Sequence, residues 1–174
     1  MRKENLVQQL FDRKLAITGK QDSVYVYFEK LIKTNLYNVF TTDLVKTFKY
    51  FQGQHKNELN LIVNMRKPVC KNLAEIISKE LGIKLYGEFY RSSQTVKNCL
   101  PDSDYVFLGH CIANGKSLRS AETRLAEFNS HIKYGLYFID VRQWANTLQG
   151  LDVEIYATLY KNDLKRKYQF PPGK

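Results

Sequence analysis

The chain has 174 residues, of which 44% are hydrophobic and 13% aromatic. This composition, together with the absence of a sequence repeat or a linker, predicts one folded domain over residues 1–174. The sequence excludes a membrane span, a secretory signal peptide and a disulfide framework, so we expect a cytoplasmic (intracellular, reducing) location. The net charge of +10 is spread almost evenly apart from a basic C-terminal tail (161–174), and indicates either a solvated basic surface or a polyanionic partner such as nucleic acid.

The N-terminal segment, residues 1–34, predicts a helix and then a stretch of mixed character. Leu6 and Leu10 have the spacing of a buried helical face. Residues 23–32, SVYVYFEKLI, are β-branched and aromatic enough for a strand, but Phe28 and its apolar neighbours would also suit a helix. We therefore expect an N-terminal extension that contains both helix and strand.

The next two segments predict a strand followed by a helix. Residues 35–43, NLYNVFTTD, alternate between apolar and polar positions, which is typical of a strand. Residues 42–51, TDLVKTFKYF, place their apolar side chains on one helical face, with Thr42 or Asp43 as the N-cap.

From residue 58 onward, apolar strands alternate with amphipathic helices. Gly82 ends one of these helices at a position that suits a left-handed cap. This alternation predicts right-handed βαβ units and an α/β fold with a mainly parallel twisted sheet flanked by helices. The predicted strands cover residues 58–64, 83–90, 104–109, 134–140 and 151–160, and the predicted helices cover 73–82, 117–128 and 142–150.

Ligands of such sheets bind at the carboxyl ends of the strands. Loops 64–72, 109–117 and 140–143 follow three of the predicted strands, so we expect them to share one edge of the sheet.

The stretch YVFLGHCIANGKSLRSA, residues 105–121, has the outline of a phosphate-binding turn. Gly115 and its small neighbours precede a helix start, where free backbone N–H groups and the helix dipole favour a phosphate. Lys116 adds a positive charge, and the Ser117 hydroxyl can either cap the helix or bind the anion. An ordinary strand-to-helix turn is the alternative.

Two further basic positions follow another predicted strand. Arg66 and Lys67 could hold a pyrophosphate at the sheet edge, and a solvated basic turn before Pro68 is the alternative.

The order of elements from Asn35 to Tyr160 resembles that of type I phosphoribosyltransferases, and specifically the orotate branch. LIVNMRKPVCKNLAEIISKELGIKLY is similar to the strand, pyrophosphate loop and helix of that branch, and YVFLGHCIANGKSL is similar to its phosphoribosyl-diphosphate strand and loop. The segment LYFIDVRQWANTLQGLDVEIYATLY is similar to the last strand, helix and strand of the core. The resemblance implies the phosphoribosyltransferase-like fold and, because this branch commonly dimerises, a homo-oligomer.

The resemblance also implies where ligands would bind. The ribose-phosphate candidates are Ala113, Asn114, Gly115, Lys116 and Ser117; the pyrophosphate-loop candidates are Met65, Arg66 and Lys67; and Gly109, His110, Asp140 and Arg142 lie at the edge of the site.

Three parts of this implied site depart from the family pattern. Gly109 and His110 stand where the family has an acidic pair, and neither supplies hard oxygen ligands for Mg²⁺. The segment 87–104 is short and lacks the His-Gly pair of the family's mobile loop. Val141 separates Asp140 from the arginine that follows it. These departures predict a degenerate site without catalytic residues.

We therefore expect a non-catalytic binding or structural subunit of a homo-oligomer or of a larger assembly, with or without nucleic acid. The alternative is a divergent orotate-type enzyme that uses phosphoribosyl diphosphate, and only that alternative requires Mg²⁺. A third reading is a sensor that binds a phosphorylated ribose without turning it over. No membrane partner is expected.

Overall fold

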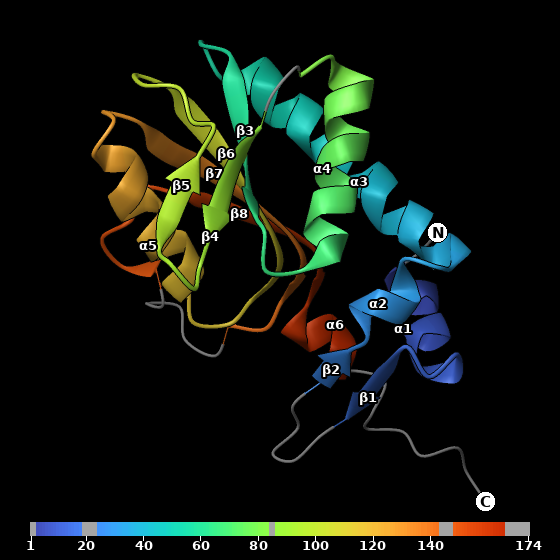
Figure 1. Cartoon of the computed structure of the whole chain (residues 1–174). Coiled ribbons are helices and arrows are strands. Elements are labelled where there is room, and N and C mark those ends of the chain that lie inside the picture. The colour runs from blue at the N-terminus through green and yellow to red at the C-terminus, as the bar shows by residue number, and fades with distance from the viewer. Residues whose placement is uncertain (1–2, 19–23, 84–85, 143–147, 166–174) are drawn as a thin grey trace, which may run out of the picture.

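A six-stranded sheet forms the centre of the molecule (Figure 1), and its strand order is β5-β4-β3-β6-β7-β8. The computed structural model describes residues 3–18, 24–83, 86–142 and 148–165. All neighbouring strands are parallel except β4 and β5, which confirms the predicted mainly parallel sheet. The strands are β3 (Leu59–Asn64), β4 (Gly87–Tyr90), β5 (Thr95–Lys97), β6 (Asp104–Ile112), β7 (His131–Asp140) and β8 (Glu154–Tyr160).

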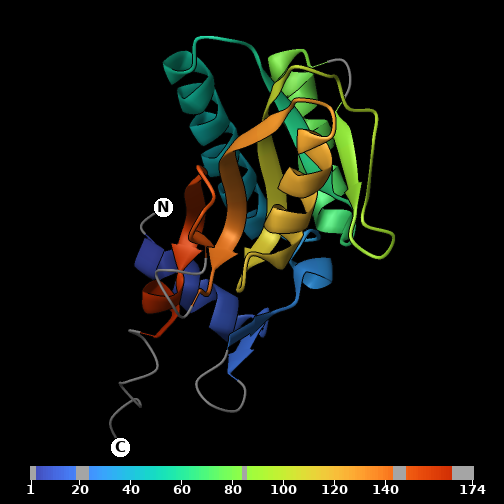
Figure 2. The same cartoon turned by 90° about the vertical axis from the view of Figure 1, so that its left-hand side faces the viewer.

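Helices cover both faces of the sheet, as Figures 1 and 2 show. Helices α3 (Asn35–Gln54) and α4 (Pro68–Leu81) pack on one face, and α5 (Lys116–Ala126) packs on the other. Each helix buries one apolar stripe against the strands, so that the sheet separates two hydrophobic clusters. Gly82 has φ 71° after α4, which confirms the predicted left-handed cap.

The N-terminal extension and the last helix lie together at one end of the sheet (Figures 1 and 2). The ring of Phe28 meets the ring of His110, near the carboxyl end of β6, at a centroid distance of 5.3 Å. The extension therefore lies at the carboxyl edge of the sheet. Its elements are α1 (Lys3–Asp12), β1 (Ala16–Thr18), β2 (Val24–Val26) and α2 (Phe28–Leu31), and the last helix is α6 (Lys161–Lys165). Segment 23–32 thus contains both of the structures that its sequence allows.

The predicted strand over residues 35–43 is wrong, because helix α3 begins at Asn35. Leu36, Phe40, Leu44 and Phe48 are all buried, and their spacing of four residues is that of one helical stripe. Neither predicted cap lies at the start of this helix, because the N-cap position is held by Thr34.

The short strand β5 is missing from the sequence prediction, and several boundaries differ, of which two bear on the site. Helix α4 starts at Pro68 rather than residue 73, because proline is favoured at the first helical position, where no N–H is needed. Strand β6 continues to Ile112 rather than ending at Gly109, so that His110 lies on a strand and not in a loop. The predicted helix 142–150 falls largely on residues 143–147, and most of the basic tail falls on 166–174, both outside the described residues.

No helix among the described residues is long and apolar enough to cross a membrane.

Replacing Thr158 by valine is expected to raise the free energy of unfolding by about 1 kcal/mol. Its Oγ1 is buried and has no hydrogen-bond partner within the part of the chain that the structure describes, so no protein group compensates the desolvation of the hydroxyl. Urea denaturation measures the change. Thr41→Val is the matched control, since buried Thr41 donates to the carbonyl of Asn38 at 3.1 Å and its loss should be destabilising. Equal effects of both substitutions would contradict this assignment.

Candidate functional site

The carboxyl edge of the sheet brings two of the predicted loops together around one cavity of about 220 Å³. The third predicted loop adjoins them, because the N–H of Val141 donates to the carbonyl of Ile112 at 2.9 Å. Residues at the ends of β3 and β6 thus face the same hollow. Its lining consists of Asn64, Arg66, Arg91, Phe107, residues 110–118 and Tyr137.

The loop before α5 turns sharply at Gly115 into the first residue of the helix. Gly115 is the N-cap of α5 and has φ 67°, a left-handed conformation that glycine adopts without strain. The N–H of Lys116 donates to Asn114 Oδ1 at 3.2 Å, so the side chain of Asn114 already satisfies one of the free N–H groups at this helix start. Ser117 lies inside the helix and lines the cavity instead of capping. All five ribose-phosphate candidates, including Ala113, line the cavity.

The other loop contributes one cation to the cavity. The N–H of Met65 donates to the carbonyl of Phe89 at 3.0 Å and fixes the start of this loop against β4. Arg66 lines the cavity and also an adjoining hollow that Met65 and Arg91 share. Lys67 instead pairs with Glu29 of the N-terminal extension, at 3.7 Å between Nζ and Oε1.

The ring of Tyr137 covers Gly109. The two residues are direct partners across β6 and β7. A Cβ atom on Gly109 would lie 2.4 Å from Tyr137 Cε1 and 2.8 Å from Cδ1, closer than Cβ atoms approach other atoms. The position where the family resemblance places the first acid therefore has no room for a side chain while the tyrosine ring stays where it is.

Asp140 and Arg142 bind each other. The Arg142 Nε and Nη2 groups donate to the two carboxylate oxygens of Asp140, at distances of 2.6 to 3.0 Å, and the Arg142 N–H donates to Oδ1 at 2.9 Å. Asp140 is buried, so this bidentate pair neutralises a carboxylate that would otherwise be costly to bury. Both residues lie at the predicted edge, but neither lines the cavity.

His110 is held neutral. Its ring stands edge-on to that of Phe28, and burial, followed by the positive charges of Lys67 and Arg66, lowers the pKa of His110 from its ordinary 6.5 to about 4. At neutral pH the imidazole therefore adds no positive charge to the cavity.

Stability is expected to fall by up to about 2 kcal/mol between pH 7 and pH 4.5 because of His110 alone. The folded-state pKa lies below the unfolded value, so the unfolded chain takes up the proton first, and stability is lost as the pH falls below 6.5 toward 4. Urea denaturation at both pH values should show a smaller loss for His110→Gln than for the wild type. The same loss in both proteins would contradict the lowered pKa.

The lining of the cavity does not fit Mg²⁺. No aspartate or glutamate is among the lining residues, and the oxygens of the nearby carboxylate of Asp140 are occupied by Arg142. Magnesium needs hard oxygen ligands, usually at least one carboxylate together with substrate phosphates. Elsewhere in the described residues, no group of three or more His, Cys, Asp or Glu side chains is placed to hold a metal ion.

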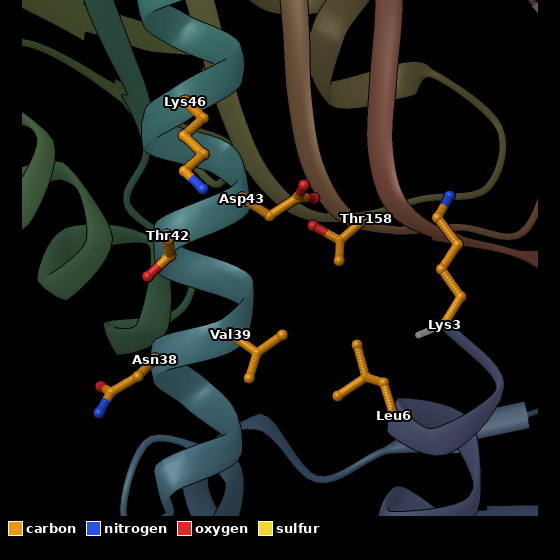
Figure 3. Close-up of a pocket in the computed structure, with 8 residues that line it drawn as sticks. All are labelled: Lys3, Leu6, Asn38, Val39, Thr42, Asp43, Lys46 and Thr158. Carbon is orange, nitrogen blue, oxygen red and sulfur yellow. The ribbon is translucent and has the colours of Figure 1, made fainter. Parts of the chain in front are cut away.

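A larger cavity of about 480 Å³ lies between α1, α3 and β8 (Figure 3). Figure 3 shows Asp43 and Thr158 pointing toward each other across it, and Asp43 Oδ2 accepts a hydrogen bond from the Tyr156 hydroxyl at 2.9 Å. None of the predicted site residues lines this cavity. The loops at the carboxyl ends of β3 and β6 do not line this cavity either. We therefore place the candidate site in the smaller cavity of about 220 Å³.

One residue of the candidate site needed the structure to be recognised. Tyr137 is missing from the sequence prediction, although glycines at 109 and 135 in strands signal a close approach by a large group. Arg91 and Lys97 are the two basic residues of segment 87–104 that the sequence offers as substitutes for those of the family's mobile loop. Arg91 lines the cavity, whereas Lys97 Nζ lies 5.2 Å from the ring centre of Tyr90.

Comparison with solved structures identifies the class of fold. Orotate phosphoribosyltransferase from Aeropyrum pernix is similar to this chain with a TM-score of 0.72 and 18% identity, over 95% of this chain and 99% of that one. UMP synthase from Leishmania donovani matches with a TM-score of 0.67 and 14% identity, over 97% of this chain and 39% of the longer protein. Adenine phosphoribosyltransferase from Leishmania tarentolae matches with a TM-score of 0.67 and 12% identity, over 91% and 88%.

The chain therefore has the fold of the type I phosphoribosyltransferases. Orotate phosphoribosyltransferases are prominent among the similar structures, as the resemblance of the sequence segments predicts. No protein-family model and no curated protein matches the sequence.

Proposed function

We propose that this protein uses the phosphoribosyltransferase fold to bind a phosphorylated ribose and does not transfer it to a base. The observation that carries the proposal is the ring of Tyr137, which packs over Gly109 and lines a cavity that has no carboxylate among its lining residues. The phosphate end remains suited to an anion, because it combines the turn at Gly115 with the charge of Lys116.

Charge reversal at Lys116 tests the phosphate end. Lys116→Glu is expected to weaken binding of ribose 5-phosphate by about 1 to 3 kcal/mol, or about 5- to 150-fold, since it replaces a charged contact by a repulsive one. Isothermal titration calorimetry measures the affinity. Lys79→Glu on α4 makes the same change of net charge at an exposed position outside the cavity and should leave the affinity unchanged. Equal affinities of the wild type and Lys116→Glu would show that the loop is only a turn.

The second part of the proposal is that the protein acts as a subunit of a homo-oligomer or of a larger assembly. Exposed aromatic side chains support it, because such residues are enriched where proteins meet partners. Tyr25 and Tyr27, 58% and 39% exposed, come from the N-terminal extension, and Tyr50 on α3 is 61% exposed. Light scattering on the purified protein measures self-association.

A nucleic-acid partner, which the charge of +10 would favour, is tested by retention of nucleic acid at low and high salt.

A further inference from the structure

Two glycines make a slot for the ring of Tyr137. Gly109 lies opposite the tyrosine on β6, and Gly135 precedes it on the same face of β7. A Cβ atom on Gly135 would lie 2.9 Å from Tyr137 Cε2, just as one on Gly109 would meet the other edge of the ring. The ring therefore rests against the backbone of both strands, in a position that side chains at 109 or 135 would prevent.

The ring also forms part of the cavity floor. Tyr137 is 3% exposed and lines the cavity together with Phe107, whose ring centre is 6.1 Å away. Burial holds the pKa of the Tyr137 phenol well above its ordinary value, so the hydroxyl stays protonated and is a poor ligand for Mg²⁺, and a hydrated cation would lose water against the ring without compensation. The floor suits the carbon skeleton of a sugar better than a metal ion.

The charged side chains stand at two places around this floor. Lys116 and the turn at Gly115 lie at the carboxyl end of β6, while Arg66 and Arg91 follow β3 and β4. Both arginines also line the adjoining hollow, so the positive charge continues beyond the cavity. Guanidinium groups bind phosphate oxygens directly, with paired N–H donors and without a bridging cation.

We infer that Tyr137 makes ligand binding in this cavity independent of a divalent cation, so that the site accepts a metal-free sugar phosphate with two separated anionic groups. The inference rests on the proposed function and adds the form of the ligand to it. One anionic group lies at the turn before α5, the sugar lies against the Tyr137 ring, and Arg66 and Arg91 face the second group. A cation bound to that second group would reduce its attraction to the arginines.

Calorimetric titration with phosphoribosyl diphosphate, in EDTA and in excess Mg²⁺, tests the inference on the full chain. The wild type is expected to bind equally well in both conditions, or up to about threefold more weakly with Mg²⁺. The corresponding difference in binding free energy is smaller than the contribution of one charged hydrogen bond. Tightening of wild-type binding by Mg²⁺ of about tenfold or more would overturn the inference and leave the proposed binding function intact.

A double variant provides the converse measurement. Gly109→Asp together with Tyr137→Ala removes the ring and places a carboxylate in the space, so Mg²⁺ should then tighten binding by about tenfold or more. If this variant folds and Mg²⁺ has no effect on it, the ring is not the determinant and the inference fails. If it does not fold, the wild-type titrations in EDTA and in Mg²⁺ decide the question. Absence of binding in both conditions by the wild type would instead overturn the proposed function itself.

Discussion

Replacing Phe138 by alanine is expected to lower the free energy of unfolding by about 3 to 5 kcal/mol, as for other large aromatic residues removed from a core. The side chain on β7 is fully buried, and its ring contacts those of three aromatic residues from α2 and α3. The centroid distances are 5.5 Å to Phe28, 5.9 Å to Tyr37 and 5.5 Å to Phe40. Truncation to alanine removes contacts on several sides at once and leaves a cavity, and the surrounding rings cannot all relax into this space.

Urea denaturation measures this loss, and Phe128→Ala is the control. Phe128 is 44% exposed, so the same substitution there should change the free energy of unfolding by less than about 0.5 kcal/mol. Because Phe28 also packs on His110, the Phe138 variant should loosen the N-terminal extension at the candidate site. A loss below about 1 kcal/mol would show that the extension does not share this core.

The sequence predicts the fold wherever burial follows a local period. The predicted alternation of strands and helices after residue 58 is confirmed, because the apolar residues within each element recur with the period of that element. Segment 35–43 is misassigned because its apolar residues satisfy a period of two and a helical period equally well, and only packing against β7 and β8 selects the helix. The early start of α4 could have been predicted from Pro68.

The candidate site is predictable only where its residues are neighbours in the chain. The turn at Gly115 is visible because a strand, a glycine and a helix start follow one another. The contact between Tyr137 and Gly109 depends on the register of β6 against β7, which no short segment contains. The pairing of Asp140 with Arg142 likewise depends on how the two side chains turn, and it removes both from the set of groups free to bind a ligand.

The unmodified protein is expected to show no appreciable base phosphoribosylation with Mg²⁺ and the common pyrimidine and purine bases. The reaction develops positive charge on the ribose while pyrophosphate leaves, so the sugar and the metal must be held in place and water must be excluded. The lining of the cavity includes the Tyr137 ring and no carboxylate. Loss of one positioning element commonly costs about a hundredfold in rate, and two are absent here, the acidic pair and the His-Gly loop.

Restoring the acidic pair with Gly109→Glu and His110→Asp is not expected to recover activity. A side chain at 109 would meet Tyr137 Cε1 at 2.4 Å and force the ring out of its slot, and an aspartate at 110 would be desolvated against the ring of Phe28. The variant should therefore unfold at lower urea concentration than the wild type, with no gain in nucleotide formation. Release of pyrophosphate and formation of nucleotide, measured for both proteins with each base, check the prediction. Robust turnover by the unmodified chain on any free base would establish the divergent enzyme instead, with the arginines at 66 and 91 and the turn at Gly115 sufficient to position its substrate.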